Sequence, residues 1–198
     1  MTTLLRSGKL ATPTGYKVRA SNYNELEHVA SELRPMLPKV PGDRYRIDCR
    51  KVLEKTLPQA GFYIHVSEVS NMPDCAAFTI PDDDLVVFRE DIYDLVQTDN
   101  VYGRSTVIHE MSHIVLKHAA TLHRGSPAGR HRHFEDSEWQ AKALTAAIMM
   151  PINVCRTISS ASALARACGT SVQAAGYRLE RLVQSGLIKP KDFYRGPI

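Results

Sequence analysis

The stretch 107-VIHEMSHIVLKH-118 decides how this sequence is interpreted. It places His109, Glu110 and His113 in the order His-Glu-x-x-His. Residues four positions apart on an α-helix share a face, with Cβ atoms about 6 Å apart, so the two imidazoles can converge on one metal ion. Glu110 is rotated by roughly one hundred degrees from His109, which directs it toward a water on the metal, where a general base is needed. The apolar neighbours indicate a buried helix that keeps water away from such a site.

The motif alone does not establish a metal site, because His-Glu-x-x-His also recurs by chance on the polar face of ordinary helices. A third ligand would separate the two interpretations. We expect His118 to point away from the pair, because it lies five residues beyond His113 on the same predicted helix. Glu138 opens the next predicted helix, and two histidines with one glutamate form a catalytic zinc arrangement. The remaining candidate ligands are His123, His131, His133, Glu135 and Asp136.

Upstream of the motif, the sequence predicts helices followed by a small sheet. Two helices with capping residues are expected, over 21–38 (Ser21 or Asn22) and over 47–57 (Asp48). β-Branched and aromatic residues predict a strand over 61–69, and two apolar runs around Pro-Asp-Asp-Asp predict a hairpin over 76–88. A helical turn over 89–96 precedes the motif helix, which we expect to extend from about Val101 to about Leu122.

Downstream of the motif, the chain predicts only loops and helices. The polar, basic stretch 123–136 contains Gly and Pro and predicts a loop. Three more helical segments are expected, over 137–151 (capped by Ser137, ended near Pro151), within 152–168 and within 171–185. Because the strands come early and the helices late, without strand-helix-strand alternation, the sequence predicts an α+β fold.

The length of 198 residues, with 43% hydrophobic and 23% charged residues, is that of an ordinary globular chain with a proper core. We expect a flexible arm over 1–20, a core over 21–151 and a helical tail over 152–198 that packs on the core. No apolar run approaches membrane-spanning length, so we expect no membrane partner. The four cysteines lie far apart, and the first residues lack an apolar signal region, which favours a cytoplasmic protein.

Two paired motifs in the chain resemble those of the ImmA/IrrE family of zinc metallopeptidases. The family pattern Arg-x-Thr-x-x-His-Glu-x-x-His is present as Arg104, Thr106, His109, Glu110 and His113. The pattern Glu-x-x-Ala, followed by two hydrophobic residues and Pro at a helix end, is present as Glu138, Ala141 and Pro151. The resemblance covers roughly residues 45–185. The chain departs from the family in having Ser112 for a common Gly and Leu144 for a common aromatic residue.

The resemblance implies a zincin-like minimal metallopeptidase core, made of a small sheet and the motif helix. It implies one zinc ion per chain, bound by His109, His113 and Glu138. It further implies an endopeptidase in which zinc-activated water attacks the peptide bond and Glu110 acts as the general base. Family members cut helix-turn-helix repressors, so a repressor is the expected protein substrate and transcription regulation the expected role.

The residues leave open which group stabilises the oxyanion or contacts the substrate. The candidates are Tyr102, Arg104, His123, His131 and His133. For Arg104 we favour a salt bridge that holds the helix. A strand of the predicted hairpin, within 75–80 or 83–88, can offer its edge to an extended peptide. The alternative is that these two strands pair only with each other.

The tail stretch 164-LARACGTSVQAAGYRLERL-182 has small residues where a helix-turn-helix needs them. In that arrangement Tyr177, Arg178 and Arg181 would face DNA. We favour a tail that supports the core or positions a substrate over one that binds DNA, because a net charge of +4 is a weak electrostatic footprint. The alternative function is a DNA-binding or protein-binding regulatory module with a vestigial metal site, against which the intact Glu110 argues.

Overall fold

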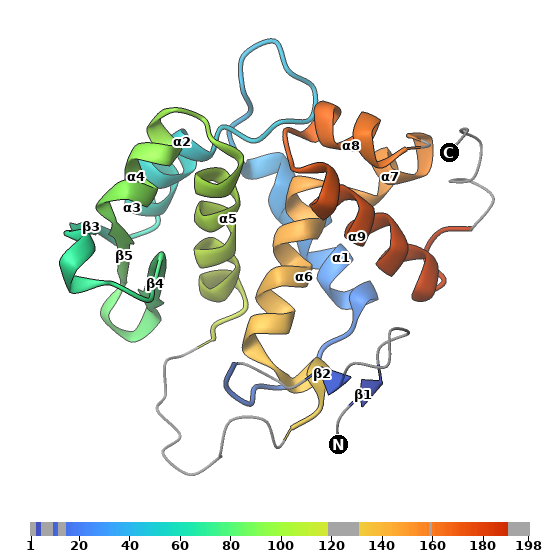
Figure 1. The fold of residues 1–198 in the computed structure, drawn as a ribbon, viewed down its shortest axis with the longest axis horizontal. Coiled ribbons are helices and arrows are strands. Elements are labelled where there is room, and N and C mark those ends of the chain that lie inside the picture. Colours follow the sequence, from blue (N-terminus) through green and yellow to red (C-terminus); the bar gives the residue numbers. More distant parts are fainter. Residues whose placement is uncertain (1–2, 5–9, 12–14, 119–130, 159, 190–198) are drawn as a thin grey trace.

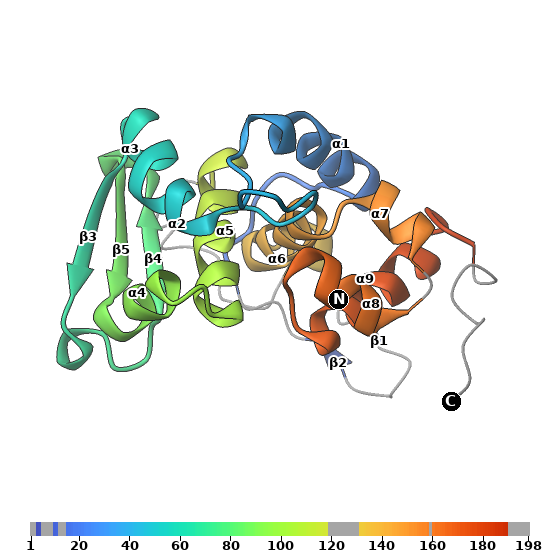
Figure 2. The same ribbon diagram turned by 90° about the horizontal axis from the view of Figure 1, so that it is seen from above.

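The structure is a computed structural model that describes residues 3–4, 10–11, 15–118, 131–158 and 160–189. Helices and a small sheet give the α+β class that the sequence predicts. Figures 1 and 2 show the sheet at one end, the motif helix near the centre and the tail helices at the other end. Among the residues described, no helix combines the length and the apolar character needed to cross a membrane.

The sheet consists of β3 (Tyr63–Ser67), β4 (Ala77–Ile80) and β5 (Leu85–Arg89), in the order β3-β5-β4. β5 pairs in parallel with β3 and in antiparallel with β4, so the predicted hairpin is confirmed. A turn over Pro81–Asp83, with Asp84 in the left-handed region at φ 50°, joins the hairpin strands. β5 is therefore the central strand, and β4 is an edge strand that packs against the motif helix.

The upstream helices begin where the capping residues predict. Asn22 caps α1 (Tyr23–Leu33) by accepting the Glu25 amide, and Asp48 caps α2 (Cys49–Lys51) by accepting the Lys51 amide. The second helix continues through a π-helical stretch (Val52–Thr56) into α3 (Leu57–Gln59). The predicted helical turn before the motif is a helix of two turns, α4 (Glu90–Gln97).

The motif helix, α5 (Val101–Val115), is shorter than its sequence predicts. Asn100 caps its start by accepting the Tyr102 amide. Near its end Lys117 adopts a left-handed conformation at φ 51°, and the His118 amide donates to the His113 carbonyl at 3.0 Å. The expected extension to about Leu122 is wrong because this left-handed residue reverses the chain, as in other helix C-terminal motifs.

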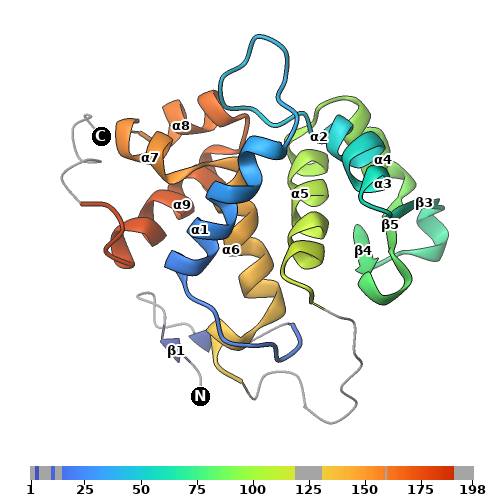
Figure 3. The same cartoon turned by 180° about the vertical axis from the view of Figure 1, so that it is seen from behind.

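The second central helix, α6 (Ser137–Met149), packs directly on α5. Its cap is Asp136 and not Ser137, because the Asp136 Oδ1 atom accepts the Trp139 amide at 2.9 Å. The Ser137 hydroxyl instead accepts the Tyr16 amide at 3.0 Å. Figure 3 shows α1 lying over α6 on the far side, so that α6 is enclosed between α1 and α5.

The tail forms α7 (Ile152–Thr157), α8 (Ala161–Cys168) and α9 (Val172–Gln184), so the range 152–168 holds two helices where one was expected. Its apolar side chains join the buried cluster that also contains residues of the sheet and of α5 and α6. Buried tail residues in that cluster include Leu164, Ala175, Leu179 and Leu182. The tail thus packs on the core through the inward face of α9.

Arg178 on α9 lies inside this packing, with a side chain that is 2% exposed. Its Nη2 atom donates to Glu27 on α1 at 2.9 Å, and its Nε atom donates to the Met150 carbonyl at 3.1 Å. The interpretation of Arg178 as a DNA contact is therefore wrong, because its guanidinium is used to join α9, α1 and the end of α6.

We expect Arg178→Ala to destabilise the fold by about 3 kcal/mol or more, because it leaves the Glu27 carboxylate largely buried without its partner. Urea unfolding followed by circular dichroism measures this change. Arg181→Ala is the matched control, since its guanidinium bonds to Gln184 at the surface, and we expect a change within about 0.5 kcal/mol. Equal stabilities of the two variants would contradict this role of Arg178.

Candidate metal centre

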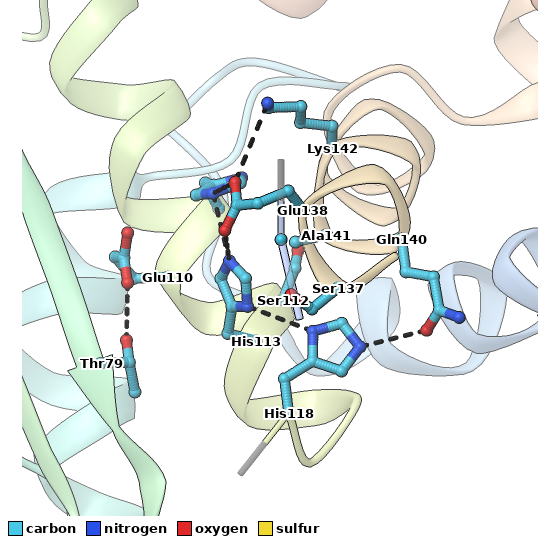
Figure 4. A network of polar contacts seen from close by, with 12 residues as sticks. Thr79, Glu110, Ser112, His113, His118, Ser137, Glu138, Gln140, Ala141 and Lys142 are labelled. Atoms are coloured by element: carbon cyan, nitrogen blue, oxygen red, sulfur yellow. Dashed lines mark hydrogen bonds and ion pairs between the residues drawn. The ribbon is translucent and has the colours of Figure 1, made fainter. Parts of the chain in front are cut away.

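Three side chains from two helices converge at the crossing of α5 and α6. The Nε2 atoms of His109 and His113 lie 3.2 Å apart. The Glu138 carboxylate reaches both imidazoles, with Oε2 at 3.3 Å from His109 Nε2 and Oε1 at 3.2 Å from His113 Nε2. Figure 4 shows Glu138 extending from α6 toward His113 on α5. These three residues form a group that can hold a metal ion.

The nitrogen and carboxylate atoms of this group lie as close together as the ligands of a small tetrahedral cation. Ligands bound tetrahedrally at about 2.0–2.1 Å from zinc are separated from one another by roughly 3.3 Å. The Nε2–Nε2 separation of 3.2 Å has this size, and so do the separations of 3.3 and 3.2 Å from the two nitrogens to the two oxygens of the Glu138 carboxylate. Two imidazole nitrogens that face each other also form no favourable contact unless a proton or a cation lies between their lone pairs. The donor set of two nitrogens and one oxygen is one that zinc accepts.

Glu138 is the member of this group that the local sequence pattern could not position, because more than twenty residues of sequence separate it from His113. Hydrogen bonds from His109 and His113 hold the pKa of Glu138 far below its usual range. The carboxylate is therefore charged at neutral pH, as a metal ligand has to be. Lys142, one turn along α6, adds a distant ion pair at 3.8 Å.

Glu110 lies beside His109, His113 and Glu138 and outside their group. Glu110 is 5% exposed, and its Oε2 atom accepts the Thr79 hydroxyl of β4 at 2.7 Å. Figure 4 shows this pair on the sheet side of α5, with His113 and Glu138 on the α6 side. Burial raises the pKa of Glu110, which the hydrogen bond from Thr79 partly opposes. The carboxyl is thereby made a better proton acceptor than an exposed one.

His118 contacts the back of the His113 ring. The two Nδ1 atoms lie 3.1 Å apart, and His118 Nε2 lies 3.1 Å from the Gln140 Oε1 atom. An amide oxygen only accepts, so we assign the proton to Nε2 of His118 and the acceptor role to its Nδ1. His113 then donates through Nδ1, and its Nε2 would offer a lone pair to a metal ion that takes the place of the proton shared with Glu138. The expectation that His118 points away is wrong, because the chain reverses after Val115.

Two features keep His118 in this neutral tautomer. Burial lowers its pKa to about 4, so the ring carries no second proton at neutral pH. The orientation of the Gln140 amide is fixed by two hydrogen bonds, in which its Nε2 atom donates to the Arg19 carbonyl at 2.7 Å and to the Phe134 carbonyl at 2.9 Å. Gln140 therefore presents its oxygen to His118 and not its nitrogen.

The site opens into a cleft of about 1240 Å³. Its walls come from β4, α5, α6, α9 and the segment around Tyr16 and Val18. α9 contributes Tyr177, which is 57% exposed, and Arg181. The outward face of α9 thus lines the same cleft as His109, His113 and Glu138.

The residues named as oxyanion or substrate contacts separate into three groups. Tyr102 and His133 line the cleft. Arg104 is 1% exposed and bonds to the Gly169 and Ile47 carbonyls, so it joins α5 to the tail away from the cleft. His131 is buried against Asp136, with Nε2 at 2.9 Å from Oδ2. His123 lies outside the described residues.

Sequence reasoning missed Thr79, His118 and Gln140 as neighbours of the centre. Thr79 is one residue of an apolar strand, and its register against α5 depends on the packing of the sheet. The position of His118 follows from the left-handed conformation of Lys117, which the sequence does not predict because Gly or Asn is usual at such a position.

No known family profile and no curated protein matches this chain at a significant level.

Proposed function

We propose that this protein is a zinc-dependent metallopeptidase with a zincin-like core. The observation that carries the proposal is the close approach of the two imidazole nitrogens and the Glu138 carboxylate, at 3.2 to 3.3 Å, with a buried glutamate next to them. A motif helix packed against the edge strand of a small sheet supports the same architecture. A structural zinc site needs four protein ligands, whereas a catalytic site keeps one position open, which favours catalysis for a set of three.

A zinc ion bound by His109, His113 and Glu138 would supply Lewis acidity, which activates water and polarises a peptide carbonyl. Glu110 accepts the proton that the attacking water loses and transfers it to the amine of the leaving fragment. Its buried position and raised pKa suit both transfers, because the carboxyl binds a proton more readily than an exposed glutamate. Thr79 holds the carboxylate by one oxygen and leaves the other for the reaction.

The edge of β4 and the outward face of α9 are the surfaces available to a substrate. β4 is an edge strand in the described sheet, so an extended peptide can add to it as a further strand. The central position of β5 excludes 83–88 as that edge. The exposed Phe78 and Tyr102 on this side and Tyr177 on α9 offer apolar contacts within the cleft. We infer a protein substrate that enters the cleft as an extended segment.

The resemblance of the paired motifs to the ImmA/IrrE family supports a regulatory role. We propose a helix-turn-helix repressor as the substrate, for which the motifs Arg104–His113 and Glu138–Ala141 are the only support in the sequence. A DNA-binding function is not proposed. Arg178 is buried in the fold and paired with Glu27, so its guanidinium is not free to contact DNA.

The test is incubation of the purified protein with a repressor encoded beside it, followed by intact mass analysis of the products. We expect two fragments whose masses sum to the substrate plus one water. Removal of metal by a chelator should stop cleavage, and zinc alone should restore it. An uncut repressor together with uncut unrelated helix-turn-helix proteins would contradict the proposed substrate. Cleavage that continues at full rate without metal would contradict the proposed chemistry.

A further inference from the structure

Residues 15–21 lie along the start of α6, beside the metal ligand Glu138. The Val18 amide donates to the Glu135 carbonyl at 2.8 Å, and the Ser21 amide donates to the Phe134 carbonyl at 3.0 Å. The Ser137 amide donates in return to the Tyr16 carbonyl at 3.0 Å. We call residues 15–21 the brace segment. Residues 15–20 were expected to belong to a flexible arm, whereas the backbone of the brace segment is bonded to residues 134–137, at and just before the start of α6.

The two residues that precede Glu138 are both bonded to the brace segment. Asp136 caps α6 through Oδ1, while its Oδ2 accepts the Gly15 amide at 2.8 Å and lies 2.9 Å from His131 Nε2. The Ser137 hydroxyl accepts the Tyr16 amide at 3.0 Å. Asp136 and Ser137 are almost fully buried, so these bonds are protected from water. The orientation of the first turn of α6, and hence of Glu138, follows from them.

Gly15 brings the brace segment into direct contact with the ligand. A Cβ atom at this position would lie 2.5 Å from Ser137 Oγ, 2.7 Å from Glu138 N and 2.9 Å from Glu138 Cγ. Two of these atoms belong to Glu138 itself, and its backbone nitrogen cannot yield without a shift of α6. Only glycine allows this approach.

A second route connects the brace segment with His113. The Arg19 carbonyl accepts Gln140 Nε2 at 2.7 Å, and Gln140 Oε1 lies 3.1 Å from His118 Nε2. His118 Nδ1 in turn lies 3.1 Å from His113 Nδ1. The chain of bonds fixes the tautomer of His113, as partners behind a metal-binding histidine commonly do.

We propose that the brace segment is a positioning element of the metal centre, which orients Glu138 through Gly15 and His113 through Arg19. The inference rests on the proposed zinc site. It assigns residues 15–21 to the functional site, although none of them offers a ligand atom. Partners behind a metal ligand typically change metal affinity by about 10- to 100-fold, so a disturbed brace segment should weaken zinc binding by that factor.

The test uses Gly15→Ala in the full chain and measures zinc affinity by competition with a chromophoric chelator. We expect zinc to bind about 10- to 100-fold more weakly than to the wild type. Gln140→Met, which keeps the side-chain length but removes the amide, should weaken binding in the same direction through His113. Thermal unfolding without metal is measured on each variant, so that a loss of folding is recognised.

Two controls separate positioning from general destabilisation. Gly176→Ala on α9 adds a methyl group 4.0 Å from the Ala161 Cβ atom, an ordinary contact, and should leave zinc affinity unchanged. Leu164→Ala removes a fully buried side chain of the tail and should lower the unfolding temperature without a change in zinc affinity. The proposal would be overturned if Gly15→Ala bound zinc as tightly as the wild type. It would also be overturned if Gly15→Ala and Leu164→Ala, at the same loss of stability, lost zinc affinity to the same extent. A wild-type protein that binds no zinc would instead refute the proposed function.

Discussion

Glu110→Gln is expected to abolish peptide cleavage while zinc stays bound. Glutamine has nearly the same shape and can still accept the Thr79 hydroxyl, so the fold and the cleft should be unchanged. An amide cannot take the proton that water loses, and general base catalysis contributes about 10²- to 10⁴-fold. We therefore expect a cleavage rate at least about 10²-fold below that of the wild type. Intact mass analysis of the repressor over time measures it.

Zinc content and a matched variant make this result specific. Glu110 is not among the three converging residues, so Glu110→Gln should retain about one zinc per chain by metal analysis. Glu32→Gln changes an exposed glutamate of α1 in the same way and should cut at the wild-type rate. If Glu110→Gln cuts as fast as Glu32→Gln, Glu110 is not the base. If Glu110→Gln loses zinc, the Glu110 carboxylate is itself a zinc ligand, contrary to its position outside the group of three residues.

His113→Ala is expected to remove zinc from the protein. The variant deletes one of the three ligand atoms and the partner of His118 in a single step. Zinc that binds only the folded state stabilises it, by about 4 kcal/mol when its concentration is 1,000 times the dissociation constant. We expect that stabilisation in the wild type and its absence in His113→Ala. Thermal unfolding with and without zinc, together with metal analysis, measures both effects.

His28→Ala is the matched control for this variant. His28 is exposed on α1, where it pairs with Glu32, and it lies outside the metal group. Its replacement should leave both the zinc content and the zinc-dependent rise in unfolding temperature as in the wild type. One full equivalent of zinc in His113→Ala would refute the assignment of the ligands. The same loss in both variants would point to an unspecific effect of removing a histidine.

Local sequence patterns predicted most of the secondary elements and two of the three residues of the candidate metal centre. A helix that begins after Asn100 brings His109 and His113 to one face by its period alone. Asn22 and Asp48 cap their helices as their residue types predict, because a short polar side chain accepts a nearby amide. The apolar runs on either side of Pro81–Asp83 form the expected hairpin. All these features depend on residues within a few positions of one another.

Only the tertiary structure decided the rest, because it depends on contacts between distant segments. Glu138 meets the two histidines because α6 packs on α5, a consequence of burial that no short pattern contains. Lys117 takes a left-handed conformation that its residue type does not favour, and this turns His118 back onto His113. Arg178 resembles a DNA contact in the sequence but is buried against Glu27, because packing of the tail determines which face of α9 is exposed. Periodicity thus determines which residues share a face, whereas the packing of helices and strands determines what that face meets.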